Sequence, residues 1–169
     1  MSFLASHGLS TAFLGYRSGH LLEILSDQGD SYLKSAGLSF PARANLTIML
    51  IDERENISIA DITNELKQPH QLVAQRVTLL IERGLVKKFA DPEDGRRNIL
   101  TLTKKGKHEV AILRECLEDA ICAFEELYAE IGADLNAIIQ KAIGALLDVP
   151  LESRVKNACS DEKIARAKR

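Results

Sequence analysis

Apolar residues recur every three or four positions near both ends of the chain, and this spacing predicts helices. In the first stretch the repeat begins at Leu9 and predicts a helix that ends near Gly29. Toward the other end, Thr103 is expected to cap a helix of about eight turns. Gly132 separates that helix from another one, which Pro150 ends. The apolar stripe on the eight-turn helix is longer than one small domain easily buries.

A further helix is expected soon after Leu38. Ser39 can cap free backbone amides, and Pro41 is tolerated in a first helical turn, where its missing N–H is no loss. The periodicity then turns three apolar side chains inward, namely Leu46, Met49 and Leu50.

Two short helices joined by a tight link are expected in the middle of the chain. Ser58 and Asp61 resemble a capping box with a shorter acid, which opens the first helix. Pro69 begins the second helix, and Gly84 ends it. Two short helices in this arrangement are typical of a helix-turn-helix.

The period changes after Gly84. Residues 85–90 and 98–102 are short strand-like runs, and the segment between them contains Pro92 and an Asp94-Gly95 pair. These residue types favour a chain reversal, so the pattern predicts a β-hairpin.

The charges are segregated along the chain. In total, 24 acidic and 22 basic residues give a net charge of -2, and 46% of the residues are apolar, which suits one soluble domain. Residues 67–107 carry ten basic and four acidic side chains, a net charge of +6, which leaves -8 for the rest. Because the basic segment coincides with the helix-turn-helix and hairpin, we expect it to bind a polyanion.

Composition and motifs exclude several other classes. The three cysteines, Cys116, Cys122 and Cys159, form no C-x-x-C pair and favour a reducing compartment. No apolar run is long enough to cross a membrane, so we expect a cytoplasmic protein without a membrane partner. The histidines lack metal-ligand spacing, and neither a phosphate-binding glycine loop nor a catalytic Ser-His or Cys-His pattern is present. We therefore expect no enzyme activity, catalytic residue, metal site or cofactor.

The order of the predicted elements resembles that of the MarR (multiple-antibiotic-resistance regulator) family. The sharpest resemblance is Gly84-Leu-Val followed by residues 91–106, DPEDGRRNILTLTKKG, and a weaker one is Leu38-Ser39-x-Pro41. It implies a mainly α fold with a small β-hairpin wing, that is, a winged helix-turn-helix joined to a helical dimerisation domain. The winged helix would span residues 38–102, the dimerisation region 1–37 and 103–148, and a polar tail, a frayed helix or disordered, 149–169.

The resemblance also implies a function. Members of the family are generally homodimers, and the partner chain would cover the long apolar stripe. The chain is therefore expected to be a homodimeric transcription regulator, acting as a repressor, with double-stranded DNA and a second copy of itself as partners. Its operator would be pseudo-palindromic. A winged helix that binds protein without specific DNA binding is the alternative.

Five residues of the second helix of the helix-turn-helix are candidates for DNA binding. The N-terminal part of such a helix enters the major groove, where side chains reach base edges. Gln71 and Gln75 can pair with adenine, His70 can donate to a phosphate or a guanine, and Thr78 lies on the same outward face. Arg76 is expected to bind phosphate, or alternatively to pair with an acid such as Glu65. Each residue is equally compatible with an ordinary surface position.

The hairpin supplies the other candidates. Arg96 follows the Asp94-Gly95 turn, where a guanidinium can enter a narrow minor groove. Arg97, the next residue, is a candidate for DNA binding as well. Asp94 is expected to orient Arg96 or Arg97 through an ion pair. Lys87 and Lys88 are expected to contact phosphates, or simply to face solvent.

Family analogy further implies a small aromatic or anionic effector that releases the regulator. The polar side chains expected around it are those of Tyr16, Arg17, His20 and Arg43, since a cation and an aromatic ring could hold a phenolic carboxylate. The sequence departs from the family at two positions, because Arg43 stands where many relatives have an aromatic residue and Arg76 where an apolar one is usual. The first helix also lacks the reactive cysteine of the peroxide-sensing members.

Overall fold

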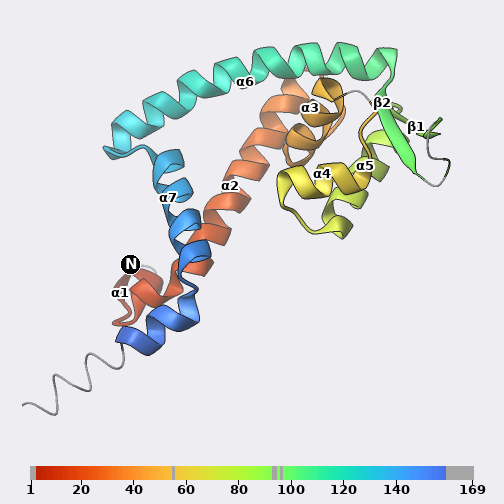
Figure 1. The fold of residues 1–169 in the computed structure, drawn as a ribbon. Coiled ribbons are helices and arrows are strands. Elements are labelled where there is room, and N and C mark those ends of the chain that lie inside the picture. The colour runs from red at the N-terminus through yellow and green to blue at the C-terminus, as the bar shows by residue number, and fades with distance from the viewer. Residues whose placement is uncertain (1–2, 55, 93–94, 96, 159–169) are drawn as a thin grey trace, which may run out of the picture. The chain divides into compact units, whose positions relative to one another are not determined.

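The computed structural model describes residues 3–54, 56–92, 95 and 97–158. The chain divides into two compact units, residues 1–118 and 119–169, which we describe separately. The described part is mainly helical, with a single two-stranded hairpin (Figure 1). In chain order the elements are α1 (Phe3–Ser6), η1 (Ser10–Phe13), α2 (Leu14–Ser35), η2 (Ala42–Ala44), α3 (Asn45–Glu53), α4 (Ile59–Leu66), α5 (His70–Glu82), β1 (Val86–Ala90), β2 (Asn98–Leu102), α6 (Lys104–Ile131) and α7 (Leu135–Asp148).

The predicted helix-turn-helix and hairpin are confirmed. Helices α4 and α5 pack side by side next to the hairpin, in which β1 and β2 are antiparallel and Val86 lies opposite Leu102 (Figure 1). The backbone N–H of Leu100 donates to the carbonyl of Ile57, 2.8 Å away, so β2 is also attached to the segment that leads into α4.

One hydrophobic core holds the first unit together. It contains Ile48 of α3, Ile62 of α4, Leu80 of α5 and Leu113 of α6, each with no exposed surface. Burying a side chain of this size contributes about 1.5–3 kcal/mol. The first turns of α6 therefore belong to the same core as the winged helix.

The predicted end of the first long helix near Gly29 is wrong. The structure continues α2 to Ser35, and Gly37, with φ of 89°, follows it in the left-handed region. A Cβ built at Gly29 would lie 3.2 Å from the Cβ of Ala42. Gly29 thus allows a close approach of the next segment and does not end the helix.

The entry to α3 also differs from the prediction. Ser39 caps no helix there, because its hydroxyl contacts Glu109 of α6, and a 3-10 turn at Ala42–Ala44 precedes the α-helix. This turn changes the rotational phase of α3. As a result Leu46, predicted to face inward, is 62% exposed, whereas Leu50 is buried as predicted and Met49 is half-buried.

The local signals for helix ends are confirmed. The Ser58 hydroxyl accepts from the backbone N–H of Asp61, and the Asp61 carboxylate accepts from that of Ser58, which is a complete capping box. Gly84, with φ of 70°, ends α5. The Thr103 hydroxyl accepts from the N–H of Gly106 at 3.0 Å and so caps α6.

The second unit consists of helical segments. Asp134 caps α7 by accepting from the backbone N–H of Ala137 at 2.9 Å, and α7 ends just before Pro150, as predicted. Residues 151–158 are helical as well, which favours the helical alternative for this part of the tail. None of the helices within the described residues combines the length and apolarity needed to cross a membrane.

Gly106 sits where α6 meets the start of the hairpin. A Cβ at this position would lie 2.1 Å from the carbonyl oxygen of Leu85, which is backbone and cannot rotate away. We expect Gly106→Ala to lower the free energy of unfolding by about 1–3 kcal/mol, as overpacking does. Chemical denaturation measures this, with the exposed neighbour Lys107→Ala as control. Unchanged stability of Gly106→Ala would contradict the packing described.

Candidate nucleic-acid interface

Helix α5 carries an exposed polar stripe. Its core-facing side chains, Val73, Val77 and Leu80, are buried. Four of the predicted DNA-binding residues are exposed: Gln71, Gln75 and Thr78 lie on the opposite side, and His70 is the first residue of the helix. Helical spacing places Gln71, Gln75 and Thr78 on one face. This stripe offers donors and acceptors that can reach base edges.

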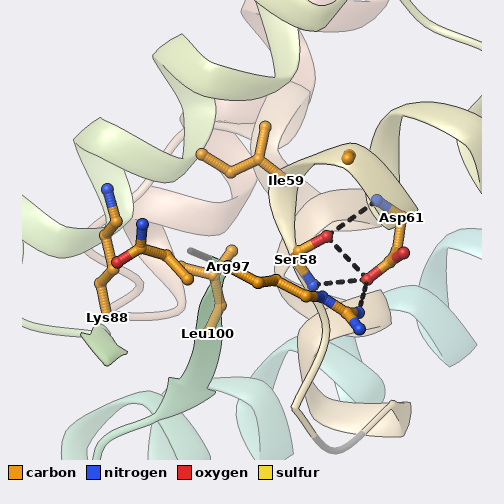
Figure 2. A pocket seen from close by; sticks show the side chains of 8 residues that line it. Ser58, Ile59, Asp61, Lys88, Arg97 and Leu100 are labelled. Carbon is orange, nitrogen blue, oxygen red and sulfur yellow. Dashed lines mark hydrogen bonds and ion pairs between the residues drawn. The ribbon is translucent and has the colours of Figure 1, made fainter. Parts of the chain in front are cut away.

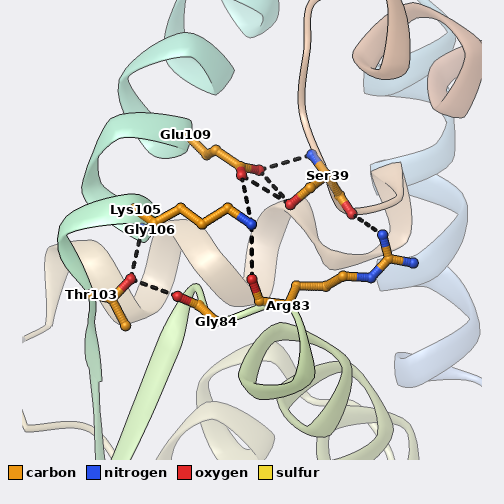
Figure 3. Close-up of polar contacts among 7 residues, drawn as sticks. All are labelled: Ser39, Arg83, Gly84, Thr103, Lys105, Gly106 and Glu109. Carbon is orange, nitrogen blue, oxygen red and sulfur yellow. Dashed lines mark hydrogen bonds and ion pairs between the residues drawn. The ribbon is translucent and has the colours of Figure 1, made fainter.

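A ring of polar contacts fixes the C-terminal end of α5 (Figure 3). Glu109 of α6 is 5% exposed, and its carboxylate accepts from the backbone N–H of Ser39 at 2.8 Å and from the Ser39 hydroxyl at 2.9 Å. Arg83 donates to the carbonyl of Ser39 at 2.7 Å. The ammonium of Lys105 donates to the carbonyl of Arg83 at 2.9 Å and lies 3.6 Å from the Glu109 carboxylate. The ring joins α5, α6 and the entry to α3.

A second polar contact connects the hairpin to α4 (Figure 2). The Arg97 guanidinium donates to Asp61, the carboxylate of the α4 capping box, and lies 3.8 Å from Asp91. Asp61 and Arg97 border a cavity of about 550 Å³, which Ser58, Lys88 and Leu100 also line. Lys87 and Lys88 on β1 are exposed, which fits both alternatives considered from the sequence.

The charge of Asp61 is stabilised by its surroundings. Hydrogen bonds from the backbone and hydroxyl of Ser58, together with the Arg97 guanidinium, hold the pKa of the Asp61 carboxyl below its usual range. Asp61 is therefore ionised at neutral pH.

Sequence reasoning missed two acidic partners. Asp94 is predicted to orient Arg96 or Arg97, and the structure adds Asp61, which accepts from Arg97, and Asp91, which lies near it. Asp94 and Arg96 themselves lie outside the described residues. The capping box was the sequence signal that Asp61 has a structural role. Its pairing with Arg97 had no local signal, because the two residues are 36 positions apart.

Arg76 already has an intramolecular partner. Its guanidinium donates to the side-chain oxygen of Gln68, whereas Glu65, the acid considered from the sequence, accepts from Arg54 at 3.0 Å. Arg76 is half-buried, so part of its donor capacity is used inside the protein.

The four residues expected to surround an effector do not share one cavity in this chain. Arg43 lines a cavity of about 360 Å³ with Gln75 and Arg76, whereas Arg17 lines a smaller one near η1. Ala42, the residue before Arg43, approaches α2 at Gly29. His20 lies nine residues before Gly29, which corresponds to about 13 Å along the helix. Tyr16 and Arg17 precede His20 and are still farther from Gly29, because each helical turn adds about 5.4 Å.

Cysteines and metal ligands add nothing to this surface. Cys116 is buried in the core, Cys122 is exposed on α6, and Cys159 lies outside the described residues. Within the described ranges, three or more His, Cys, Asp or Glu side chains nowhere gather as a metal site would need.

A comparison with family models finds one similar region. Residues 37–97, which contain α3, α4, α5 and β1 but not β2, match the model described as MarR family. This part of the chain is similar to that family. No curated protein matches the whole sequence significantly.

Solved structures of transcription regulators share the fold. The transcriptional repressor CouR, bound to a 23-mer DNA duplex, has a TM-score of 0.63 and 21% identity, covering 83% of this chain and 96% of that chain. The M. tuberculosis transcriptional regulator MOSR in complex with DNA has a TM-score of 0.61 and 17% identity, covering 86% and 97%. The transcriptional regulator SlyA has a TM-score of 0.57 and 20% identity, covering 89% and 96%.

These likenesses confirm the predicted fold class, a winged helix-turn-helix with additional helices. The three named structures are all described as transcription regulators or repressors.

Proposed function

We propose that this protein is a homodimeric transcription regulator that binds a pseudo-palindromic DNA operator. The observation that carries the proposal is the exposed polar stripe of α5 beside a basic hairpin, within a segment of net charge +6. Two structures of the same fold, CouR and MOSR, were solved with DNA. By analogy with the repressor CouR, binding would block transcription.

Each part of the interface has a separate role in this proposal. Gln71 and Gln75 read base edges in the major groove, and Thr78 supports them from the same face, while His70 at the start of the helix donates to a phosphate or a guanine. Arg76 contacts a phosphate with the donors that Gln68 leaves available. Lys87 and Lys88 contact phosphates along the hairpin, and Arg96 enters the minor groove.

Selection of bound fragments from random DNA tests this reading. We expect enriched sequences with two inverted half-sites about 34–36 Å apart, centre to centre. The logarithm of the binding constant should fall with the logarithm of salt concentration by about 0.9 per phosphate contact. Arg96→Ala should weaken operator binding about tenfold, because a minor-groove cation is lost, and Lys141→Ala in α7 serves as the control.

A shallow salt dependence without any enriched sequence would contradict DNA recognition. It would favour the alternative, a winged helix that binds another protein.

Dimerisation is supported by apolar side chains that the single chain leaves exposed. In the second unit they include Ile138, Ile143 and Leu147, which are 50%, 54% and 73% exposed. In the first unit, α2 exposes Leu14, and Leu22 is 65% exposed. Contiguous exposed apolar surfaces of soluble proteins commonly mark interfaces, and a second copy of the chain is the occupant that we propose.

Substitution of Leu147 tests the dimer. Because Leu147 is exposed in the single chain, Leu147→Glu should leave the secondary structure intact and shift the protein from dimer to monomer at micromolar concentration. Sedimentation velocity measures the shift, and Gln140→Glu, an exposed polar position of the same helix, is the control. A wild-type chain that sediments as a monomer would refute the dimer itself.

An anionic effector is proposed for the cavity at Arg43. Its wall combines two guanidinium groups with Pro41, Leu72 and Leu79, and no acid is among the described residues that line it. This lining suits a carboxylate on a flat apolar body. Titration calorimetry with phenolic acids should show binding that Arg43→Ala weakens at least severalfold and that added operator competes away. Unchanged affinity of Arg43→Ala would place any effector elsewhere.

A further inference from the structure

Arg97 connects three separate segments at the base of the hairpin loop. One of its side-chain nitrogens donates to Asp61 of α4, and another lies 3.8 Å from Asp91, at the other end of the loop. In addition, the backbone N–H of Asp91 donates to the carbonyl of Arg97 at 2.8 Å. Arg97 therefore closes the loop and attaches it to α4 at the same time.

The carboxylate that receives Arg97 is itself held in place. The same oxygen of Asp61 accepts from the backbone N–H of Ser58 at 2.8 Å and lies 2.7 Å from the Ser58 hydroxyl (Figure 2). Ser58 is 6% exposed and begins a helix whose Ile62 is fully buried. Asp61 is thus a fixed point on a rigid element, whereas the side chains of most surface ion pairs move freely.

The hairpin has few other attachments that set its direction. Leu100 and Ile99 of β2 are buried, and Leu100 pairs with Ile57. Toward the loop, Asn98 is exposed, and so are Lys87, Lys88, Phe89 and Ala90 of β1. The contact between Arg97 and Asp61 lies beyond the buried part of β2, so it fixes the direction in which the loop leaves the core.

We propose that Asp61 is a wing-positioning residue and that Arg97 is its partner rather than a DNA contact. The proposal rests on the proposed DNA-binding function and assigns to α4 a role in presenting Arg96 to the minor groove.

Electrostatics support this division of roles. Two carboxylates near Arg97 offset its positive charge, so it adds little to the attraction for phosphate. If Arg97 turned to DNA instead, the Asp61 carboxylate would lose its cationic partner beside a polyanion, which is unfavourable. The pair is accordingly most useful when it stays closed in the complex.

The two roles predict opposite effects of the same substitution. If Asp61 positions the wing, Asp61→Asn and Arg97→Gln should each weaken operator binding by about five- to tenfold, the lower end of the loss of a direct arginine contact. The double variant should bind the operator about as tightly as the single variant with the lower affinity, because both changes break the same interaction. If Arg97 instead contacts DNA, Asp61→Asn frees it and should strengthen binding.

Two further measurements separate positioning from folding. Both partners of the ion pair are 43% exposed, and exposed pairs contribute little to stability, so the melting temperature should change little in Arg97→Gln. Glu65→Gln breaks another exposed ion pair of α4, with Arg54 at 3.0 Å, and as the control it should leave both the melting temperature and operator affinity near wild type. Hydroxyl-radical footprints of Asp61→Asn should lose protection in the minor groove at the operator flanks and keep protection around the half-site centres.

The outcomes distinguish this proposal from the proposed function. Wild-type protein that selects no operator would refute the function itself. Wild-type protein that binds its operator, with Asp61→Asn binding equally well or better and the flank protection unchanged, would overturn only the positioning role. Additive losses in the double variant would overturn it as well.

Discussion

The buried carboxylate of Glu109 is the constraint on which the geometry of the winged helix depends. A charge removed from water is costly unless it is paired and hydrogen-bonded, and here Ser39 and Lys105 supply the partners. Those partners in turn hold Arg83 at the end of α5. Apolar burial has no direction, whereas these contacts do, so the polar ring specifies how α5 is oriented on α6.

The surface proposed to face DNA carries less free positive charge than a count of its residues indicates. The basic segment has a net charge of +6, yet several of its cations have partners within the protein. Arg83 donates to the carbonyl of Ser39, Lys105 donates to the carbonyl of Arg83 and lies near Glu109, and Arg97 binds Asp61. These cations stabilise the structure of the interface and contribute little free charge to it. The lysines of β1 and the polar stripe of α5, in contrast, are exposed.

Apolar residues of α6 differ in exposure between the first and the second unit. In the first unit the apolar residues at the start of α6, Val110 and Leu113, are buried in the core shared with the winged helix. Farther along the same helix, Ile121 and Phe124 are 58% and 41% exposed. The first turns of this apolar stripe therefore stabilise the fold, whereas the later ones expose apolar side chains that the proposed dimer would cover.

The sequence by itself determined the elements whose signals are local. The Ser58-Asp61 capping box, the left-handed glycine after α5 and the hairpin between residues 86 and 102 were all predictable, because each depends on neighbouring residues. Likewise, the outward stripe of α5 followed from helical periodicity. The family resemblance supplied the expectations of a dimer and of DNA binding.

Tertiary structure decided the features that join distant segments. Ser39 looked like a helix cap, but Glu109, 70 residues away, offers its hydroxyl a charged acceptor. Gly29 looked like a helix end, but Ala42 packs against it and the helix continues. Arg97 looked like a DNA contact oriented by a neighbour, but Asp61 lies within hydrogen-bonding distance once the core places β2 beside α4. In each case a local preference is worth about 1 kcal/mol, which a charged or close-packed long-range contact equals or exceeds.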